Sequence, residues 1–156
     1  MTLELHATPE EVMRAVDALQ EFGRTRQVAE KTLFGLALAL EECGSNIVNH
    51  ALRRDARQTF RVTLEHTGSA IVAELRDGGP EFDPTQAPVM EREANDDDRP
   101  PGGWGIQLVR RFTDEVRYTR EGGENVLRLT KRLGAQTALE MTSPDGSNNP
   151  QQTTTQ

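Results

Sequence analysis

TFRVTLEHTGSAIVAELR, residues 59–76, predicts a β-hairpin in the middle of the chain. Apolar and polar residues alternate with a period of two over residues 59–65 and again over residues 70–76, which is typical of half-buried strands. The intervening His66-Thr67-Gly68-Ser69 has the length and composition of a hairpin connection. We therefore expect a sheet built around these two strands.

Two helices are predicted on the N-terminal side of the hairpin. Residues 8–26 begin with Thr8-Pro9-Glu10-Glu11, where a capping threonine precedes proline at the first helical position and glutamate at the third. The apolar stripe of this helix is Val12, Val16, Leu19 and Phe22, and that of the second, at residues 29–52, is Leu33, Leu36, Leu40, Cys43 and Ile47. Residues 2–7 alternate and are predicted as a short strand.

The chain changes character after the hairpin. Residues 77–103 are rich in proline, glycine and acids, and such a long connection is typically a lid or a disordered segment. A helix is predicted at 104–112, followed by strands at 115–119 and 126–133. The order predicts an α+β fold, a two-layer sandwich with a mixed, mostly antiparallel sheet and helices on one face. We expect this domain at residues 1–134 and a disordered polar tail at residues 135–156.

Composition narrows the possible functions. A net charge of −7 argues against a broad nucleic-acid surface, which needs clustered basic residues, but allows a small polyanion. No apolar run approaches the roughly 20 residues of a membrane helix, and the N-terminus lacks the pattern of a secretory signal. The single cysteine, Cys43, cannot form an internal disulfide, so we expect a reducing, cytoplasmic location.

Three short motifs carry the candidate chemistry. Glu42 and Asn46 are four residues apart on the second helix, so they share a face; the amide oxygen suits Mg²⁺ and the carboxylate can accept a proton. Asp77 ends a strand, where its carboxylate can hold the exocyclic amine of adenine, and Gly79 lets the backbone pass close to the ring. Gly103 and Gly105 start a helix, whose exposed amides can bind phosphate. Each motif alone also has an interpretation without function: the first as a pair of solvated polar residues, the second as a turn and the third as a flexible helix start.

As a set, the motifs resemble the GHKL (gyrase and histidine-kinase-like) ATPase superfamily, and more narrowly the anti-sigma factor serine/threonine kinases. The similar segments are Glu42-Cys-Gly-Ser-Asn46 with His50-Ala51, Asp77-Gly-Gly79-Pro-Glu-Phe82-Asp83-Pro84, Gly102-Gly103-Trp104-Gly105-Ile106, and Gly123-Glu-Asn125 with Thr130-Lys131. Many members of the superfamily place a threonine near adenine before the last strand. This chain has Glu124-Asn125 there, so no such threonine is assigned.

The resemblance implies a Bergerat-type ATP-binding fold and a role for each matching residue. Glu42 would be the general base toward a serine or threonine of a protein substrate, and Asn46 would coordinate Mg²⁺. Adenine would lie against Asp77 and Gly79. The phosphates would lie against Gly103, Gly105 and Ile106. The implied partners are a STAS-domain anti-anti-sigma factor as substrate, a sigma factor that is sequestered, and a second copy of the chain in a homodimer, without direct contact to nucleic acid or membrane.

Alternatives remain at this level. The segment from Glu91 to Asp98 holds five acids, which oppose a bound triphosphate unless they point away, and this favours a module that captures a partner in response to ATP without transferring phosphate. The ATP domain of a split histidine kinase is a further alternative, although the chain lacks a phospho-accepting helix hairpin. The stripe that includes Val12 and Phe22 could contribute to a dimer or could be core.

Overall fold

The computed structural model describes residues 1–86 and 105–134, which form one sheet and one layer of helices. The strands are β1 (Thr2–His6), β2 (Thr59–His66), β3 (Ala70–Asp77), β4 (Glu115–Glu121) and β5 (Glu124–Arg132). The helices are α1 (Pro9–Arg24), α2 (Glu30–Asn46) and α3 (Gly105–Phe112), with a π-helical turn η1 (Ile47–Ala51) and a 3-10 turn η2 (Pro84–Gln86). The segment predicted to be a lid and the predicted disordered tail lie outside the described residues.

The sheet has the strand order β1-β2-β3-β5-β4. The predicted hairpin is confirmed, because β2 and β3 pair from Phe60 opposite Asp77 to His66 opposite Ile71. In its connection, Gly68 has a φ of +87°, a left-handed conformation that glycine adopts without strain. All four pairings among the described strands are antiparallel, so the expected mixed sheet was wrong in that detail. The reason is that β5 forms a hairpin with β4 and then runs in the opposite direction to β3, its other neighbour.

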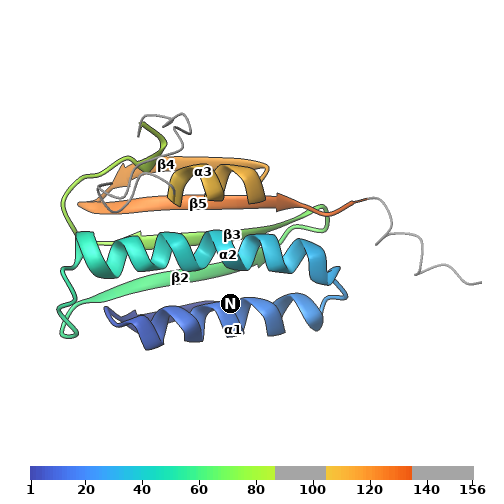
Figure 1. Ribbon diagram of the computed structural model, residues 1–156, viewed down its shortest axis with the longest axis horizontal. Coiled ribbons are helices and arrows are strands. Elements are labelled where there is room, and N and C mark those ends of the chain that lie inside the picture. Colours follow the sequence, from blue (N-terminus) through green and yellow to red (C-terminus); the bar gives the residue numbers. More distant parts are fainter. Residues whose placement is uncertain (87–104, 135–156) are drawn as a thin grey trace, which may run out of the picture.

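The three helices lie against one face of the sheet, with α2 between α1 and α3 (Figure 1). Thr8 caps α1 as predicted, since its hydroxyl accepts a hydrogen bond from the backbone N–H of Glu11 at 3.4 Å. Both predicted apolar stripes are buried and belong to one core with the inner face of the sheet. The stripe on α1 is therefore core, and it does not provide a dimer surface.

The second predicted helix differs from the structure at its C-terminal end. The α-helical pattern stops at Asn46, and η1 continues it with the wider π-type spacing, as in the bond from the N–H of Leu52 to the carbonyl of Ile47 at 2.8 Å. Arg53 and Arg54 then adopt φ values of +52° and +58°, which no helix can continue. Periodicity alone does not distinguish a π turn from another α turn, because the same side chains remain apolar.

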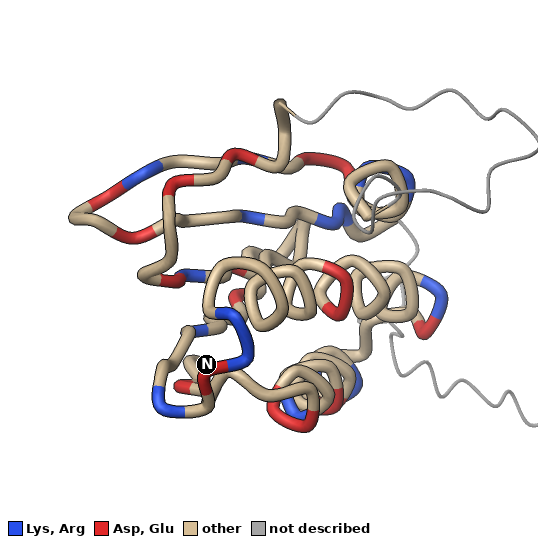
Figure 2. The backbone as a smooth tube through the Cα atoms, turned by 60° about the vertical axis from the view of Figure 1, so that its left-hand side comes forward, with Lys and Arg blue, Asp and Glu red and all other residues tan. Residues whose placement is uncertain are grey.

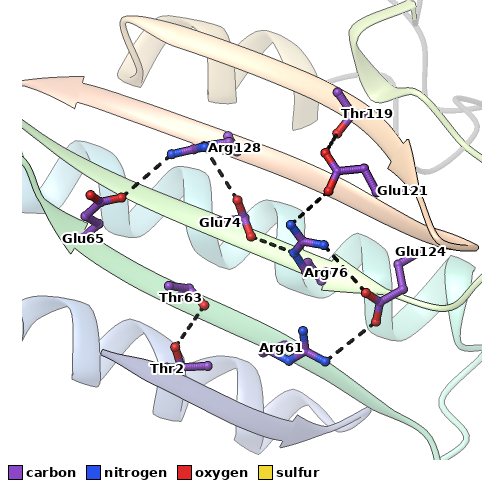
Figure 3. A network of polar contacts seen from close by, with 10 residues as sticks. All are labelled: Thr2, Arg61, Thr63, Glu65, Glu74, Arg76, Thr119, Glu121, Glu124 and Arg128. Atoms are coloured by element: carbon purple, nitrogen blue, oxygen red, sulfur yellow. Dashed lines mark hydrogen bonds and ion pairs between the residues drawn. The ribbon is translucent and has the colours of Figure 1, made fainter.

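The outer face of the sheet is covered by polar side chains rather than by helices (Figure 3). Arg76, on the central strand β3, contacts Glu74 at 2.7 Å, Glu121 at 3.1 Å and Glu124 at 3.8 Å. Arg128 on β5 extends the network to Glu74 and to β2. Side chains from four neighbouring strands, β2, β3, β5 and β4, are thus tied together across this face.

Acidic and basic residues are interspersed along the described strands and helix ends, without a broad basic region (Figure 2). Within residues 1–86 and 105–134, no helix has the length and apolar character needed to cross a membrane.

The network on the outer face predicts a measurable stability difference between two arginines. Arg76→Leu is expected to lower the free energy of unfolding by about 1 kcal/mol, because it leaves the half-buried Glu74 without its closest partner. Arg117→Leu is the matched control, since Arg117 is 69% exposed in its side chain and contacts only Glu115 among the ion pairs of the described residues. Urea unfolding of both variants measures the difference, and equal effects would contradict the structural role of Arg76.

Candidate functional site

A cavity of about 550 Å³ lies where the end of α2 and η1 meet the ends of β3, β4 and β5. Apolar side chains form most of its wall, and polar groups occur at a few positions. The lining residues are Cys43, Asn46, Ile47, His50, Ala51, Asp77, Pro80, Glu81, Phe82, Pro84, Tyr118, Asn125 and Leu127. Concave, mostly apolar sites with a few convergent polar groups are typical of small-molecule binding.

The predicted pair on the second helix meets at one edge of this cavity. Asn46 lines the cavity, and its side-chain nitrogen donates a hydrogen bond to Oε1 of Glu42 at 3.2 Å. Both side chains are half-buried, because the rest of this helical face packs into the core. With its nitrogen turned to Glu42, Asn46 is left with an amide oxygen that accepts no hydrogen bond from the described residues.

The start of α3 approaches the same pair. A Cβ atom added to Gly105 would overlap the carboxyl group of Glu42, with its Cδ at 2.6 Å, so a larger residue here would displace that carboxyl group from its present position. The side chain of Ile106 is buried in the core, which leaves its backbone as the part available to a ligand. Gly103, the other glycine predicted for phosphate, lies outside the described residues.

Asp77 ends β3 on the inner face of the sheet and is only 5% exposed. Its Oδ1 accepts hydrogen bonds from the backbone N–H of Gly79 at 2.9 Å and from the side-chain nitrogen of Asn125 at 3.0 Å. Gly79 in turn lies against the end of η1, since an added Cβ would meet the Ala51 Cβ at 2.8 Å. The structure thus brings Asp77 to the same cavity as Asn46, with Gly79 hydrogen-bonded behind Asp77.

Three residues at this site were missed by the sequence reasoning. Asn125 lies opposite Asp77 in the β3–β5 pairing, and its side-chain oxygen accepts from the Tyr118 hydroxyl and from Arg120, both at 2.8 Å. Arg120 also donates to the carbonyl of Gly79 at 2.9 Å. Tyr118 falls on the strand predicted at 115–119, whereas Asn125 lies just before the strand predicted at 126–133, and only the long-range register shows that they meet beside Asp77.

Two further residues of the cavity wall, His50 and Cys43, differ in their exposure to solvent. His50 lines the cavity and is exposed, whereas Cys43 is buried. Burial, and secondarily the charge of Glu42, raises the pKa of the Cys43 thiol to about 12. At neutral pH this cysteine is a protonated, small wall residue, which agrees with its predicted core-side position.

Comparisons with known proteins agree with the fold. The sequence model of a family described as "histidine kinase-like ATPase domain" matches residues 5–131. The chain is similar to the serine/threonine-protein kinase BtrW of Bordetella bronchiseptica, with 34% identity over 131 residues, covering 83% of this chain and 91% of that protein. The crystal structure of the RsbU and RsbW domains of Rv1364c from Mycobacterium tuberculosis has a similar fold, with a TM-score of 0.61 and 18% identity. That match covers 85% of this chain and 31% of the other, so this chain spans about a third of its length.

The two adjacent glycines after β3 provide a test of the turn that holds Asp77. Gly79→Ala is expected to lower the free energy of unfolding by about 1–3 kcal/mol, because its Cβ would meet the Ala51 carbonyl at 3.0 Å as well as Asp77. Gly78→Ala is the matched control, since nothing lies within 4 Å of the Cβ it would add. Chemical unfolding of both variants gives the comparison, and an equally stable Gly79→Ala would contradict the close packing.

Proposed function

Because this chain belongs to the histidine kinase-like ATPase domain family, we propose that it is an ATP-dependent protein serine/threonine kinase. It would bind Mg-ATP in the cavity and transfer the γ-phosphoryl group to a serine or threonine of a STAS-type anti-anti-sigma protein. It would also sequester a sigma factor, as the resemblance of its motifs implies. A similar protein named a serine/threonine kinase, matched over 91% of its length, supports the proposal.

The observation that carries the proposal is that residues from three separate segments, α2, β3 and α3, lie together at one site. Asn46 and Asp77 line the same cavity, although they lie 31 residues apart in the sequence, one on a helix and the other on a strand. Glu42 is hydrogen-bonded to Asn46, and Gly105 lies against Glu42. A base, an amide oxygen, an acceptor for a nucleobase and a helix start are therefore within one binding region.

The cavity fits the nucleobase of ATP. Its volume of about 550 Å³ lies within the usual range for small-molecule sites. Oδ1 of Asp77 is occupied by donors from Gly79 and Asn125, whereas no described residue donates to Oδ2. An exocyclic amine could donate to that second oxygen, while Phe82 and Leu127 provide apolar wall for the ring.

The opposite edge of the cavity fits the phosphates and a metal ion. The free amide oxygen of Asn46 suits Mg²⁺, which prefers oxygen ligands and often takes most of them from phosphates and water. Within residues 1–86 and 105–134, no cluster of three or more His, Cys, Asp or Glu side chains could hold a metal ion. The ion would thus bind together with the nucleotide, and backbone amides from Gly105 and Ile106 would face the phosphates.

The proposed transfer requires little covalent chemistry from the protein. The acceptor hydroxyl oxygen forms a bond to the γ-phosphorus, the bond from that phosphorus to the bridging oxygen of ADP breaks, and the hydroxyl proton passes to the Glu42 carboxylate. Magnesium would neutralise charge on the transferred group. The hydrogen bond from Asn46 fixes the orientation of the Glu42 carboxyl group, and the absence of a side chain at Gly105 keeps the region beside it open.

Glu42→Gln tests the proposed base. The substitution preserves size, so the affinity for Mg-ATP is expected to stay within about threefold, whereas transfer is expected to fall by at least about a hundredfold. Glu41→Gln is the matched control, because Glu41 is the adjacent acid and is not part of the Glu42–Asn46 hydrogen bond. Calorimetry measures binding, and a phosphate-affinity gel with candidate STAS proteins measures transfer.

The same experiment separates the kinase from the alternative function. If the wild type binds Mg-ATP and a STAS partner but no partner is phosphorylated, the chain is an ATP-dependent binding module rather than a kinase. Retention of a sigma factor from native lysate, with and without ATP, tests the proposed sequestration. Analytical ultracentrifugation tests the proposed homodimer.

Asp77→Asn tests the proposed nucleobase contact. The variant would place an amide where Gly79 and Asn125 now donate to a carboxylate, so Mg-ATP affinity is expected to fall by at least about tenfold. Asp83→Asn is the matched control, since the Asp83 carboxylate accepts only from Thr85 among the hydrogen bonds of the described residues. Titration calorimetry of both variants gives the answer, and unchanged binding by Asp77→Asn would place the base elsewhere.

A further inference from the structure

We propose that Asn125 is a positioning residue that holds Asp77 in the one orientation from which it selects a 6-aminopurine nucleotide over a 6-oxopurine. This inference rests on the proposed binding of ATP in the cavity. It concerns a residue of β5 that would act through Asp77.

The side-chain nitrogen of Asn125 is fully used by the protein. It donates to Oδ1 of Asp77 at 3.0 Å and to the carbonyl of Pro80 at 2.9 Å. An amide nitrogen has two hydrogens, so neither is left for a ligand. Asn125 is 6% exposed, and its influence on a bound base therefore passes through the carboxylate that it contacts.

The side-chain oxygen of Asn125 fixes which way the amide faces. It accepts from the Tyr118 hydroxyl at 2.8 Å, from Arg120 at 2.8 Å and from the backbone N–H of Phe82 at 3.3 Å. Rotating the amide by half a turn would set its N–H groups against two obligate donors, Arg120 and the Phe82 amide. The nitrogen must therefore face Asp77, where it is a hydrogen-bond donor.

This orientation determines what Asp77 can offer to a ligand. With Oδ1 held by Gly79 and Asn125, Oδ2 is the carboxylate oxygen without a donor among the described residues. A 6-aminopurine such as adenine can donate its amine to that oxygen. A 6-oxopurine such as guanine has an acceptor at the same ring position, so two acceptors would face each other and the buried carboxylate would remain unpaired.

The β4–β5 hairpin at the edge of the sheet holds Asn125 in this orientation. Tyr118 and Arg120 both come from β4, and Arg120 additionally binds the Gly79 carbonyl at 2.9 Å. The segment between Asp77 and Phe82 is thus fastened to the β4–β5 hairpin at both of its ends by Asn125 and its neighbours. Discrimination between bases would thus depend on Asn125 and on the β4 side chains that hold it.

Two substitutions of Asn125 test the inference by calorimetric titration with Mg-ATP and Mg-GTP. Asn125→Ala removes the donor, and the affinity for ATP is expected to fall at least about tenfold while that for GTP falls less, so the ATP/GTP ratio decreases. Asn125→Asp keeps the acceptor oxygen but sets a second carboxyl group about 3 Å from Asp77, and such pairs share one proton. When that proton is lost at higher pH, two negative carboxylates face each other and ATP binds more weakly. From pH 6.5 to pH 8.5, the affinity of Asn125→Asp for ATP is therefore expected to fall roughly threefold or more relative to that of the wild type.

A milder pair of variants on β4 keeps the test decisive if Asn125→Ala fails to fold. Tyr118→Phe removes one hydroxyl donor to Asn125 and is expected to lower the ATP/GTP ratio by roughly threefold. Thr119→Val is the matched control, since Thr119 points to the outer face and donates to Glu121, and its ratio is expected to match the wild type.

The outcomes distinguish this inference from the function on which it rests. A wild-type protein that binds no Mg-ATP refutes the proposed function. If the wild type binds Mg-ATP, but Tyr118→Phe has the wild-type ATP/GTP ratio and Asn125→Asp has the wild-type pH profile, only the role of Asn125 is overturned. A general loss of stability with an unchanged ratio would likewise show that Asn125 is structural and does not position Asp77.

Discussion

The antiparallel pairing of β3 with β5 is the constraint on which the rest of the site depends. It joins strands that are distant in sequence, sets Asp77 directly opposite Asn125, and so places a carboxylate and an amide in hydrogen-bonding contact on the inner face of the sheet. Both side chains are nearly fully buried, and buried polar groups are stable only when they are paired. Pairing and burial together make this end of the sheet a defined surface for a ligand.

The helical layer contributes the second half of the site through close packing. The apolar side of α2 is held in the core, and this leaves Glu42 and Asn46 at the border between core and solvent. The start of α3 lies so close to Glu42 that a side chain at position 105 would displace the Glu42 carboxyl group. The π-helical turn after Asn46 brings Ala51 against Gly79 and His50 to the cavity. Helix packing thus forms one edge of the cavity, opposite the segment that follows β3.

Much of the architecture was predictable because it arises from local patterns. Period-two alternation predicted the β2–β3 hairpin, and helical periodicity together with the Thr8 cap predicted α1 and most of α2. The exclusively antiparallel sheet and the π turn were not predicted, since strand order and helix spacing follow from packing between distant segments. The same limitation hid Tyr118 and Arg120, whose function arises only where β4 meets the turn after Asp77.

The sequence by itself determined the element types, the composition of the core and the identity of the motif residues at 42, 46, 77, 79 and 105, because each depends on spacing within one segment. Tertiary structure alone decided that Asn46 and Asp77 line one cavity, that Glu42 and Gly105 meet at its edge, and that Asn125 contacts Asp77. The physical reason is that hydrogen bonds and close packing act over a few ångströms in space, and the contacts concerned join residues 48 positions apart in the chain.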